Sequence, residues 1–361
     1  MPLWLSGYSG RLVSGRSGVQ VSPEAFMKNN ELMEQAKKVY AENFPLETCF
    51  ERAIFFSWHC DIRDCAYCFM STQKVDDTKP KAVRSAESLL AELLICKKLG
   101  WDIGFISGGI GAFGKGAFSD LLKKMHELSG EKFWLNIGAL NKETLKEYAP
   151  YTKGVVGSIE TVNSKLHNNV CPSKPIEPYL EMFKEAEKLG LERAITIILG
   201  LGESEEDFDA FKNMITTYKI SKVHLYGLNP QKGTVFETSK PPTEEYQAWW
   251  IAKARTTLPK LNIQCGIWED RVDRISTLLE AGANSISKFP ALKRFGTTFA
   301  KEIEKQAEKA GRKFNGTITQ LPEIDWDAEI NNLPFEDTFK LKIKDKLDKY
   351  LSRMKKNQNK E

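Results

Sequence analysis

The sequence predicts a (β/α)8 barrel of the TIM type, with an N-terminal helical lead-in and a helical C-terminal extension. Short apolar segments of strand length alternate with amphipathic segments of helix length, which is typical of parallel βαβ units. Eight strand segments occur in succession, and this number favours a closed barrel over the alternative, an open doubly wound sheet. The 361 residues also exceed the roughly 250 that a barrel needs.

The predicted elements follow one another through short connections. Strands are expected at Ala53–Ser57, Ile103–Ser107, Phe133–Ile137, Val155–Ile159, Ala194–Leu199, Val223–Tyr226, Ile263–Ile267 and Asn284–Ser287. Helices are expected at Pro23–Asn43, Ser85–Leu99, Phe118–Leu128, Lys142–Ala149, Ile176–Leu189, Glu205–Tyr218, Thr243–Leu258 and Val272–Glu280. We expect residues 1–22 to form a flexible Gly/Ser-rich lead-in, residues 23–300 the barrel, and residues 301–361 the helical extension.

The composition excludes several classes of protein. The net charge of +4 is small, so nucleic acid is not expected as a partner. No run approaches the roughly 18 apolar residues of a transmembrane helix, and the first residues lack the apolar segment of a signal peptide. Seven cysteines, an odd number in a long chain, do not predict a disulfide framework. We therefore expect a cytoplasmic protein, not bound to a membrane, whose thiols are available to a metal.

Three of the cysteines, Cys60, Cys65 and Cys68, lie in the segment that follows the first predicted strand. Barrel enzymes carry their chemistry on such loops, at the C-terminal face of the barrel. Three thiolates can bind three irons of a [4Fe–4S] cubane and leave the fourth iron open to a small molecule. The alternative is a zinc site on Cys65 and Cys68, completed by His59 and Cys60. No second Cys-x-x-Cys pair occurs elsewhere, so the sequence favours the cluster.

The loop resembles that of the radical S-adenosylmethionine (SAM) superfamily, whose usual pattern is C-x3-C-x2-C with an aromatic residue before the last cysteine. Tyr67 supplies the aromatic ring, which is expected to lie against a purine, but four residues, Asp61–Asp64, separate the first two cysteines here. The resemblance implies a [4Fe–4S] cluster and SAM as cofactors, and reductive cleavage of SAM to a 5′-deoxyadenosyl radical. It also implies a small-molecule substrate that gives up hydrogen, and a low-potential electron donor such as ferredoxin or flavodoxin.

Further segments resemble SAM-binding segments of this superfamily, in the same order along the chain. Ser107, Gly108 and Gly109 match a Gly-Gly-Glu segment whose backbone receives the methionine amino group, although the Glu is replaced here. Glu160 matches an acidic residue that takes the ribose hydroxyls or the amino group of SAM. Arg193, which opens the fifth predicted strand, is assigned as a clamp for the SAM carboxylate. The competing interpretations are a glycine turn, a solvated carboxylate and an exposed charge at a strand start.

Two later segments also match the superfamily. In the segment TIILGLGE, Ile198 is expected to pack on adenine, and Gly200 to let the backbone approach closely. In the segment YGLNPQKGT, Tyr226 and Leu228 are expected to border adenine and substrate. The segment AGANSI at residues 281–286 resembles a stretch near the end of the biotin synthase barrel. The whole resemblance covers about residues 30–300 and is closest to the biotin synthase-like group.

Within that group, sulfur insertion by biotin synthase itself is not expected. The strand ends that would hold its second cluster carry Gly109, Asn136 and Thr196 here. Cys96 lies in a predicted helix and Cys171 in a loop, and one thiol, Cys265, cannot hold a [2Fe–2S] cluster unaided. The remaining members named by the resemblance include a methylornithine synthase and the maturase of iron–iron hydrogenase.

The widened cysteine gap and the flanking FFSWHC…CFMSTQK resemble a further branch, the radical SAM proteins that accompany the iron-only hydrogenase Hmd. This resemblance implies a hydrogenase maturation role, a radical step in biosynthesis of the guanylylpyridinol cofactor, with other cofactor-maturation proteins as partners. The alternatives are a methylornithine synthase-like enzyme, an iron–iron hydrogenase maturase-like enzyme, and an assembly scaffold that carries a cluster without SAM turnover. A zinc-dependent barrel enzyme is a third class.

Polar residues at or near strand ends are the candidates for holding the substrate. They are Asn136, Thr196, His224, Asn229 and also Tyr226. Tyr226 and Asn229 end a strand and begin its loop, which favours a role at the barrel mouth. A single histidine within a strand is more typical of a satisfied core residue, and this is the competing interpretation for His224.

Overall fold

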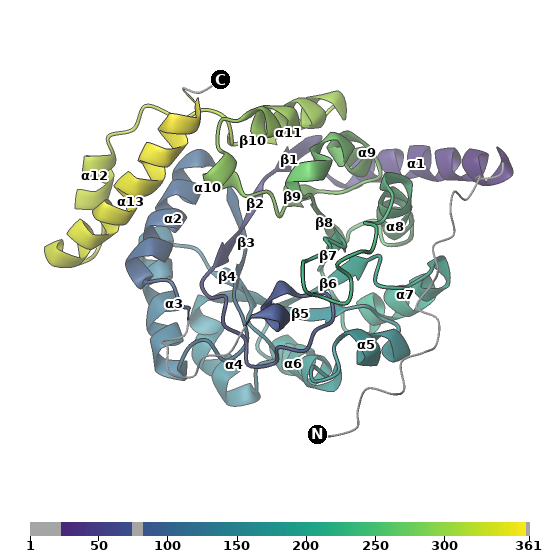
Figure 1. Cartoon of the computed structure of the whole chain (residues 1–361), viewed down its shortest axis with the longest axis horizontal. Helices are drawn as coiled ribbons and strands as arrows, with labels where there is room; N and C mark the ends of the chain where they lie inside the picture. The colour runs from purple at the N-terminus through teal and green to yellow at the C-terminus, as the bar shows by residue number, and fades with distance from the viewer. Residues whose placement is uncertain (1–22, 74–81, 359–361) are drawn as a thin grey trace.

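The computed structural model describes residues 23–73 and 82–358, and the predicted lead-in at residues 1–22 lies outside this range. A ring of strands surrounded by helices dominates the molecule (Figure 1). The ring contains β2 (Glu51–Phe55), β3 (Asp102–Ser107), β4 (Phe133–Asn136), β5 (Thr152–Glu160), β6 (Glu192–Leu199), β7 (Lys222–Gly227), β8 (Asn262–Gly266) and β9 (Ser285–Ser287).

The eight strands form one parallel sheet in which each strand pairs with the next along the chain. A parallel bridge between Phe50, just before β2, and Ile286 of β9 joins the two edges. The predicted (β/α)8 barrel is thereby confirmed, and the open sheet is excluded. Since all strands run the same way, every loop that follows a strand lies at one face of the barrel.

The outer helices alternate with the strands, because each amphipathic segment buries its apolar side against the ring. They are α2 (Ala86–Leu99), α3 (Lys115–Ser129), α4 (Lys142–Tyr148), α5 (Ser164–Val170), α6 (Glu177–Lys188), α7 (Phe208–Thr217), α8 (Glu244–Thr257) and α9 (Ile275–Glu280). Short 3-10 helices are η1 (Phe69–Thr72), η2 (Ala149–Tyr151), η3 (Glu205–Asp207) and η4 (Glu269–Arg274). Their ends carry the expected signals: Ser85 caps α2 by accepting from the Ser88 amide, and Gly100 ends it at a left-handed φ of 69°.

The segments before the first barrel strand and after the last one pack on the outside of the barrel. At the start, α1 (Pro23–Asn43) packs against α8, and β1 (Glu47–Cys49) pairs with β10 (Lys313–Asn315). At the end lie α10 (Ala291–Arg294), α11 (Thr298–Lys309), α12 (Trp326–Asn331) and α13 (Asp337–Gln358). The α13 helix lies along α2 (Figure 1), where the Tyr350 hydroxyl contacts Arg84 Nη2 at 2.7 Å and Ser88 Oγ at 2.8 Å.

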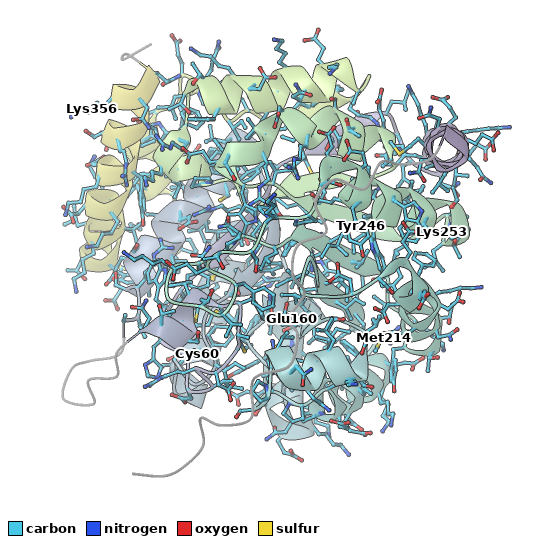
Figure 2. The ribbon with its side chains drawn as sticks, turned by 45° about the vertical axis from the view of Figure 1, so that its right-hand side comes forward. Cys60, Glu160, Met214, Tyr246, Lys253 and Lys356 are labelled. Atoms are coloured by element: carbon cyan, nitrogen blue, oxygen red, sulfur yellow. The ribbon has the colours of Figure 1, made fainter. Side chains whose placement is uncertain are left out.

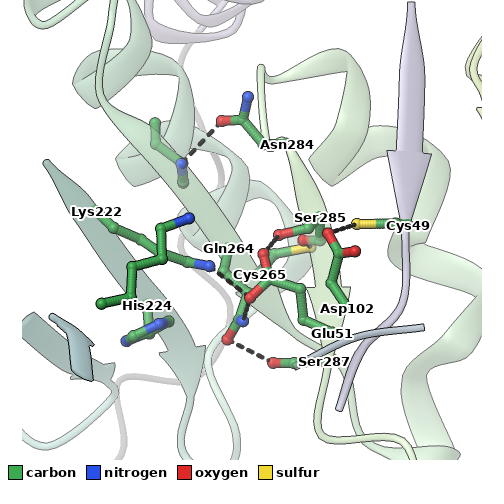
Figure 3. A network of polar contacts seen from close by, with 12 residues as sticks. Cys49, Glu51, Asp102, Lys222, His224, Gln264, Cys265, Asn284, Ser285 and Ser287 are labelled. Carbon is green, nitrogen blue, oxygen red and sulfur yellow. Dashed lines mark hydrogen bonds and ion pairs between the residues drawn. The ribbon is translucent and has the colours of Figure 1, made fainter. Parts of the chain in front are cut away.

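A network of polar side chains lies inside the barrel, toward the end where its strands begin (Figure 3). Glu51 of β2 is the centre of this network: its Oε2 lies 2.5 Å from Lys222 Nζ and also accepts from Gln264 Nε2. Ser285 Oγ donates to the other carboxylate oxygen at 2.5 Å. We call these four buried residues the barrel floor. Gln264 Oε1 extends the network upward by accepting from the Tyr226 hydroxyl at 2.6 Å.

Candidate active site at the barrel mouth

The cysteine loop follows β2 and lies on the face where all strands end, as the sequence predicts. It is fastened to the segment after β3 by backbone hydrogen bonds from the Gly109 amide to Ser57 O at 3.1 Å and from the Asp61 amide to Ile110 O at 2.9 Å. A Cβ added to Gly109 would lie 1.8 Å from His59 O. Glycine is therefore needed at position 109 because the cysteine loop lies directly against its backbone.

The four-residue gap between the first two cysteines closes as a compact turn. Arg63, inside the gap, adopts a left-handed φ of 53°, and its Nε donates to Cys60 O at 2.6 Å. A second turn brings the Cys68 amide within 3.1 Å of Cys65 O. All three thiols are partly exposed (Cys60 is labelled in Figure 2). The additional residue in the gap is thus accommodated by a turn within the loop.

The arrangement of possible ligands around this loop bears on which metal it can hold. Among the described residues, no three His, Cys, Asp or Glu side chains are grouped as a single metal ion requires. A zinc site needs four ligands around one ion, whereas a cubane takes one thiolate for each iron. Burial raises the pKa of the Cys68 thiol to about 11, so binding a metal there releases a proton. Three thiolates on one loop are a donor set that a cubane can use.

A fourth cysteine lies beside the loop. Cys171, at the end of α5, is fully buried and packs in the same apolar cluster as Cys65 and Tyr67. The neighbouring Cys171 thiol, more than burial, raises the pKa of Cys65. The Ala66 amide also donates to Val170 O at 2.8 Å, which ties α5 to the loop. This contact was not predictable from local spacing, because 106 residues separate the two cysteines.

A cavity of about 500 Å³ opens next to Cys68 at the barrel mouth. Its walls are mainly aromatic and apolar, with two amides and one ammonium group. It is lined by Phe55, Tyr67, Cys68, Phe69, Met70, Ile198, Tyr226, Gly227, Leu228, Asn229, Gln231, Trp268 and Lys288. The structure therefore brings together Tyr67, Ile198, Tyr226, Leu228 and Asn229, which the sequence analysis had assigned to SAM or substrate. A volume of this size suits a small organic ligand.

Glu160 ends β5 in a left-handed conformation with φ of 62° (Figure 2). Its carboxylate is buried and lies 2.7 Å from Lys174 Nζ, which is also buried. Burial alone would lower the pKa of Lys174, but the attraction of Glu160 together with that of Cys171, Tyr179 and Cys65 outweighs burial, so the pKa is raised. Glu160 is therefore not a solvated loop carboxylate: one of its oxygens is already committed to a lysine that the sequence analysis did not consider.

The turn after β6 is held by its own glutamate. Glu203 accepts from the amides of Gly200 at 2.6 Å, Leu201 at 2.9 Å and Gly202 at 3.2 Å. Gly200 has a φ of 98°, a conformation that only glycine adopts readily. The amides of this turn are thus occupied within the chain. From this part of the chain the cavity is lined by Ile198, near the end of β6, and by no residue of the turn itself.

The assignment of Arg193 as a clamp for the SAM carboxylate is wrong. Arg193 is the second residue of β6, at the N-terminal end of the barrel, while the cavity residue Ile198 lies near the other end of the strand. At about 3.3 Å per residue, five residues separate the two positions by roughly 16 Å. The Arg193 guanidinium instead donates to Lys219 O at 3.2 Å. The competing interpretation, a charge at the start of a strand, describes it correctly.

Three of the substrate candidates do not line the cavity. Asn136 accepts from Ser158 Oγ at 2.6 Å. Thr196 and His224 contact each other within the barrel at 3.4 Å. His224 is fully buried, and burial holds its pKa well below the usual range, with the charges of Lys222 and Lys288 acting in the same direction. This placement matches the description of His224 as a core histidine.

Lys288 is the charged residue among the described cavity residues that were not predicted from the sequence, which also include Gln231 and Trp268. It follows β9 directly, has a left-handed φ of 71°, and places its ammonium 4.4 Å from the ring centroid of Tyr226. Burial lowers its pKa, although the charges of Glu160 and Cys68 oppose this. A signal was present: a charged residue after the last barrel strand lies on the face that carries the chemistry.

Comparisons with known proteins agree with this geometry. Residues 57–215 match the model of the Radical SAM superfamily. The uncharacterized protein MJ0597 of Methanocaldococcus jannaschii is 36% identical over 314 residues, which cover 86% of this chain and 87% of that protein. This chain belongs to the radical SAM superfamily. It is a radical SAM enzyme, and the superfamily's cofactors are a [4Fe–4S] cluster and SAM.

The biotin synthase-like character is also confirmed for this radical SAM enzyme. The biotin synthase of Clostridium botulinum is 27% identical over 185 residues, which cover 50% of this chain and 57% of that protein. The crystal structure of methylornithine synthase (PylB) superposes with a TM-score of 0.68 at 17% identity, covering 86% of this chain and 97% of that chain. At this identity the superposition speaks for the fold alone. In the described part of the radical SAM chain, no helix is both long and apolar enough to cross a membrane.

Proposed function

We propose that this radical SAM enzyme abstracts hydrogen from a small molecule bound in the cavity at the barrel mouth. The observation that carries the proposal is that residues of the cysteine loop form part of the cavity wall. Tyr67 and Cys68 of the cysteine loop line the same cavity as Ile198, Tyr226 and Leu228 of the opposite strands. A ligand in this cavity lies against the metal-binding loop, which is where a short-lived radical must meet its target.

The residues present support a division of roles. Cys60, Cys65 and Cys68 would hold the [4Fe–4S] cluster, which supplies the electron that cleaves SAM to a 5′-deoxyadenosyl radical. Tyr67 and Ile198 would bound the adenine and exclude water from the reacting atoms. The Gly108-Gly109 segment would keep the loop in position, since its backbone lies directly against that loop.

Glu160 and Ser107 would contribute in two other ways, one by its charge and one by its backbone carbonyl. Glu160 would receive a donor group of SAM with the carboxylate oxygen that Lys174 leaves free, because the ion pair fixes the carboxylate at the end of β5. The Ser107 carbonyl accepts from the Phe56 amide at 2.8 Å and so anchors the start of the cysteine loop. A low-potential donor protein such as ferredoxin or flavodoxin would deliver the electron.

The decisive experiment is anaerobic reconstitution with iron and sulfide, reduction in the presence of SAM, and chromatographic assay for 5′-deoxyadenosine. Formation of 5′-deoxyadenosine by the reduced, iron-loaded protein supports the proposal. A cluster-loaded protein that binds SAM but releases no 5′-deoxyadenosine with any reductant would instead favour the assembly scaffold. A colourless protein with stoichiometric zinc would contradict the proposal.

For the pathway, we propose a radical step in biosynthesis of the guanylylpyridinol cofactor of the iron-only hydrogenase. The support is the resemblance of the widened loop, FFSWHC…CFMSTQK, to radical SAM proteins that accompany that hydrogenase. Other cofactor-maturation proteins would then be partners. The test is to express the hydrogenase with its maturation proteins, with and without this chain, and to detect the cofactor by mass spectrometry. Equal cofactor yields in both strains would contradict the assignment.

A further inference from the structure

The cavity at the barrel mouth contains one fixed positive charge. Among the described residues that line it, Lys288 is the only one with a charged group, and the other polar groups are amides, a phenol pair and a thiol. The ammonium lies 4.4 Å from the centroid of the Tyr226 ring and 5.9 Å from that of Phe105. These aromatic faces attract a cation but provide no counter-ion.

The carboxylates around Lys288 are already paired. Burial lowers the pKa of Lys288 and the charge of Glu160 opposes this, but the Glu160 carboxylate lies 2.7 Å from the ammonium of Lys174. The two acids that line the neighbouring cavity also have partners: Glu269 lies 2.5 Å from Arg294, and Asp270 lies 3.2 Å from Arg271. Within the described part of the chain, no carboxylate comes within 4.0 Å of the Lys288 ammonium.

The two lysines that are buried in the described part of the chain, Lys174 and Lys222, are arranged differently. Lys222 and Lys174 each have a carboxylate within 2.7 Å, as expected where a charge is removed from water. Lys288 is only partly buried, because it faces the cavity, and it has no such partner; its side chain starts from a left-handed backbone. Withdrawing an unpaired ammonium from water is costly unless a ligand supplies the missing charge.

We propose that Lys288 is a carboxylate-binding residue for the substrate, and that the substrate is a small organic acid with an aromatic or otherwise apolar body. The acid group would approach the ammonium, and the body would lie against Trp268 and Phe55, which line the same cavity. The Gln264–Tyr226 hydrogen bond fixes the ring beneath the ammonium and thereby sets its position. This inference rests on the proposed function in taking the cavity as the substrate site.

The test is isothermal titration calorimetry on the anaerobically reconstituted protein with SAM present, using benzoate and benzamide as probes of equal shape. We expect benzoate to bind roughly tenfold or more tightly than benzamide, because hydrogen bonds to charged groups are the stronger ones. In Lys288→Met this preference should disappear, and in Lys288→Arg it should persist. The matched control is Lys232→Met, an exposed lysine in the loop after β7, which should behave as wild type.

Two results would overturn the inference. One is equal binding of benzoate and benzamide by the wild-type protein. The other is a Lys288→Met variant that keeps the preference for benzoate while its affinity for SAM falls, as read from the SAM-induced change in the cluster's electron paramagnetic resonance signal. In that case the ammonium serves the SAM carboxylate. A failure of 5′-deoxyadenosine formation, by contrast, would contradict the proposed function and leave the anion preference measurable.

Discussion

The two ends of the barrel treat buried polar groups in opposite ways. At the floor, the Glu51 carboxylate has three partners, Lys222, Gln264 and Ser285, and the lumen is filled. At the mouth, an ammonium faces a cavity of about 500 Å³ with no carboxylate partner among the described residues, beside the loop that carries three free cysteines. The same sheet therefore carries a self-satisfied network at one end and unsatisfied donors at the other.

The difference follows from what each end must do. A network without unpaired groups contributes to the stability and the unique closure of the barrel, because any removed partner leaves a buried charge. Groups without partners cost stability, and they are retained where a ligand completes them. Changes at the mouth should therefore affect chemistry more than stability, and changes at the floor should do the reverse.

The largest effect is expected from Cys65→Ala at the mouth. Loss of one of three thiolates should abolish iron binding as an intact cubane and lower 5′-deoxyadenosine formation by a factor of at least about 10³, since transfer of the electron depends on the cluster. Iron content and the visible spectrum after anaerobic reconstitution measure this directly. The matched control is Cys49→Ser, at the floor end, where the thiol donates to Asp102 at 3.2 Å. A brown, active Cys65→Ala protein would contradict the assigned ligands.

The next effect is expected at the floor, in Glu51→Gln. This change leaves the buried Lys222 ammonium without a counter-ion and should lower the free energy of unfolding by about 3–5 kcal/mol. Chemical denaturation of the metal-free protein measures the loss. The double variant Glu51→Gln, Lys222→Met should recover part of it, because no unpaired charge remains. Unchanged stability in the single variant would show that water reaches the floor.

The sequence predicted the fold in some detail because strand segments such as Ile103–Ser107 are apolar runs of the right length. It placed the first strand two residues late, at Ala53, since Glu51 and Arg52 do not look like strand residues. The floor explains why Glu51 belongs to the strand: its partners Lys222, Gln264 and Ser285 are 171 to 234 residues away in the sequence. Only closure of the barrel brings them together.

The candidate site was predictable where short segments carry the signal, and unpredictable where contacts are remote. The cysteine loop and the cavity residues Tyr67 and Ile198 belong to local motifs, and the structure brings them together. The contact of Cys171 with Cys65 and the Glu160–Lys174 pair depend on how α5 returns to the mouth, which no spacing reveals. Arg193 was misassigned because a residue at the start of a strand lies at the wrong end of the barrel.

A smaller effect is expected from Gly109→Ala at the mouth. The added Cβ would collide with the carbonyl of His59 and force the cysteine loop away from β3, costing about 1–3 kcal/mol by overpacking. Iron content per chain should fall together with the unfolding midpoint. Gly116→Ala in α3 is the matched control, since nothing lies within 4 Å of its Cβ and alanine should stabilise the helix by roughly 0.5–1 kcal/mol. Full iron content in Gly109→Ala would show that the loop tolerates displacement.

The smallest effect concerns His224, which lies between floor and mouth, stacks on the Tyr226 ring and meets the Phe105 ring edge-on. Burial and the charges of Lys222 and Lys288 hold its pKa well below 6.5 in the folded protein. Near pH 6.5 the imidazole of His224 therefore binds a proton in the unfolded chain but stays neutral in the folded protein. The stability contributed by the neutral imidazole is complete above pH 6.5 and is lost as the pH falls, by about 1.4 kcal/mol per pH unit.

Denaturation at pH 7.5 and 5.5 should thus show a steeper loss for the wild type than for His224→Leu, which has no group to protonate. Taking the difference between the two proteins cancels the carboxylates that titrate in both. Parallel losses would mean that the imidazole takes up its proton inside the folded barrel. Water would then have to reach the middle of the lumen, and since the floor is filled by the Glu51 network, it would have to enter through the cavity at the mouth.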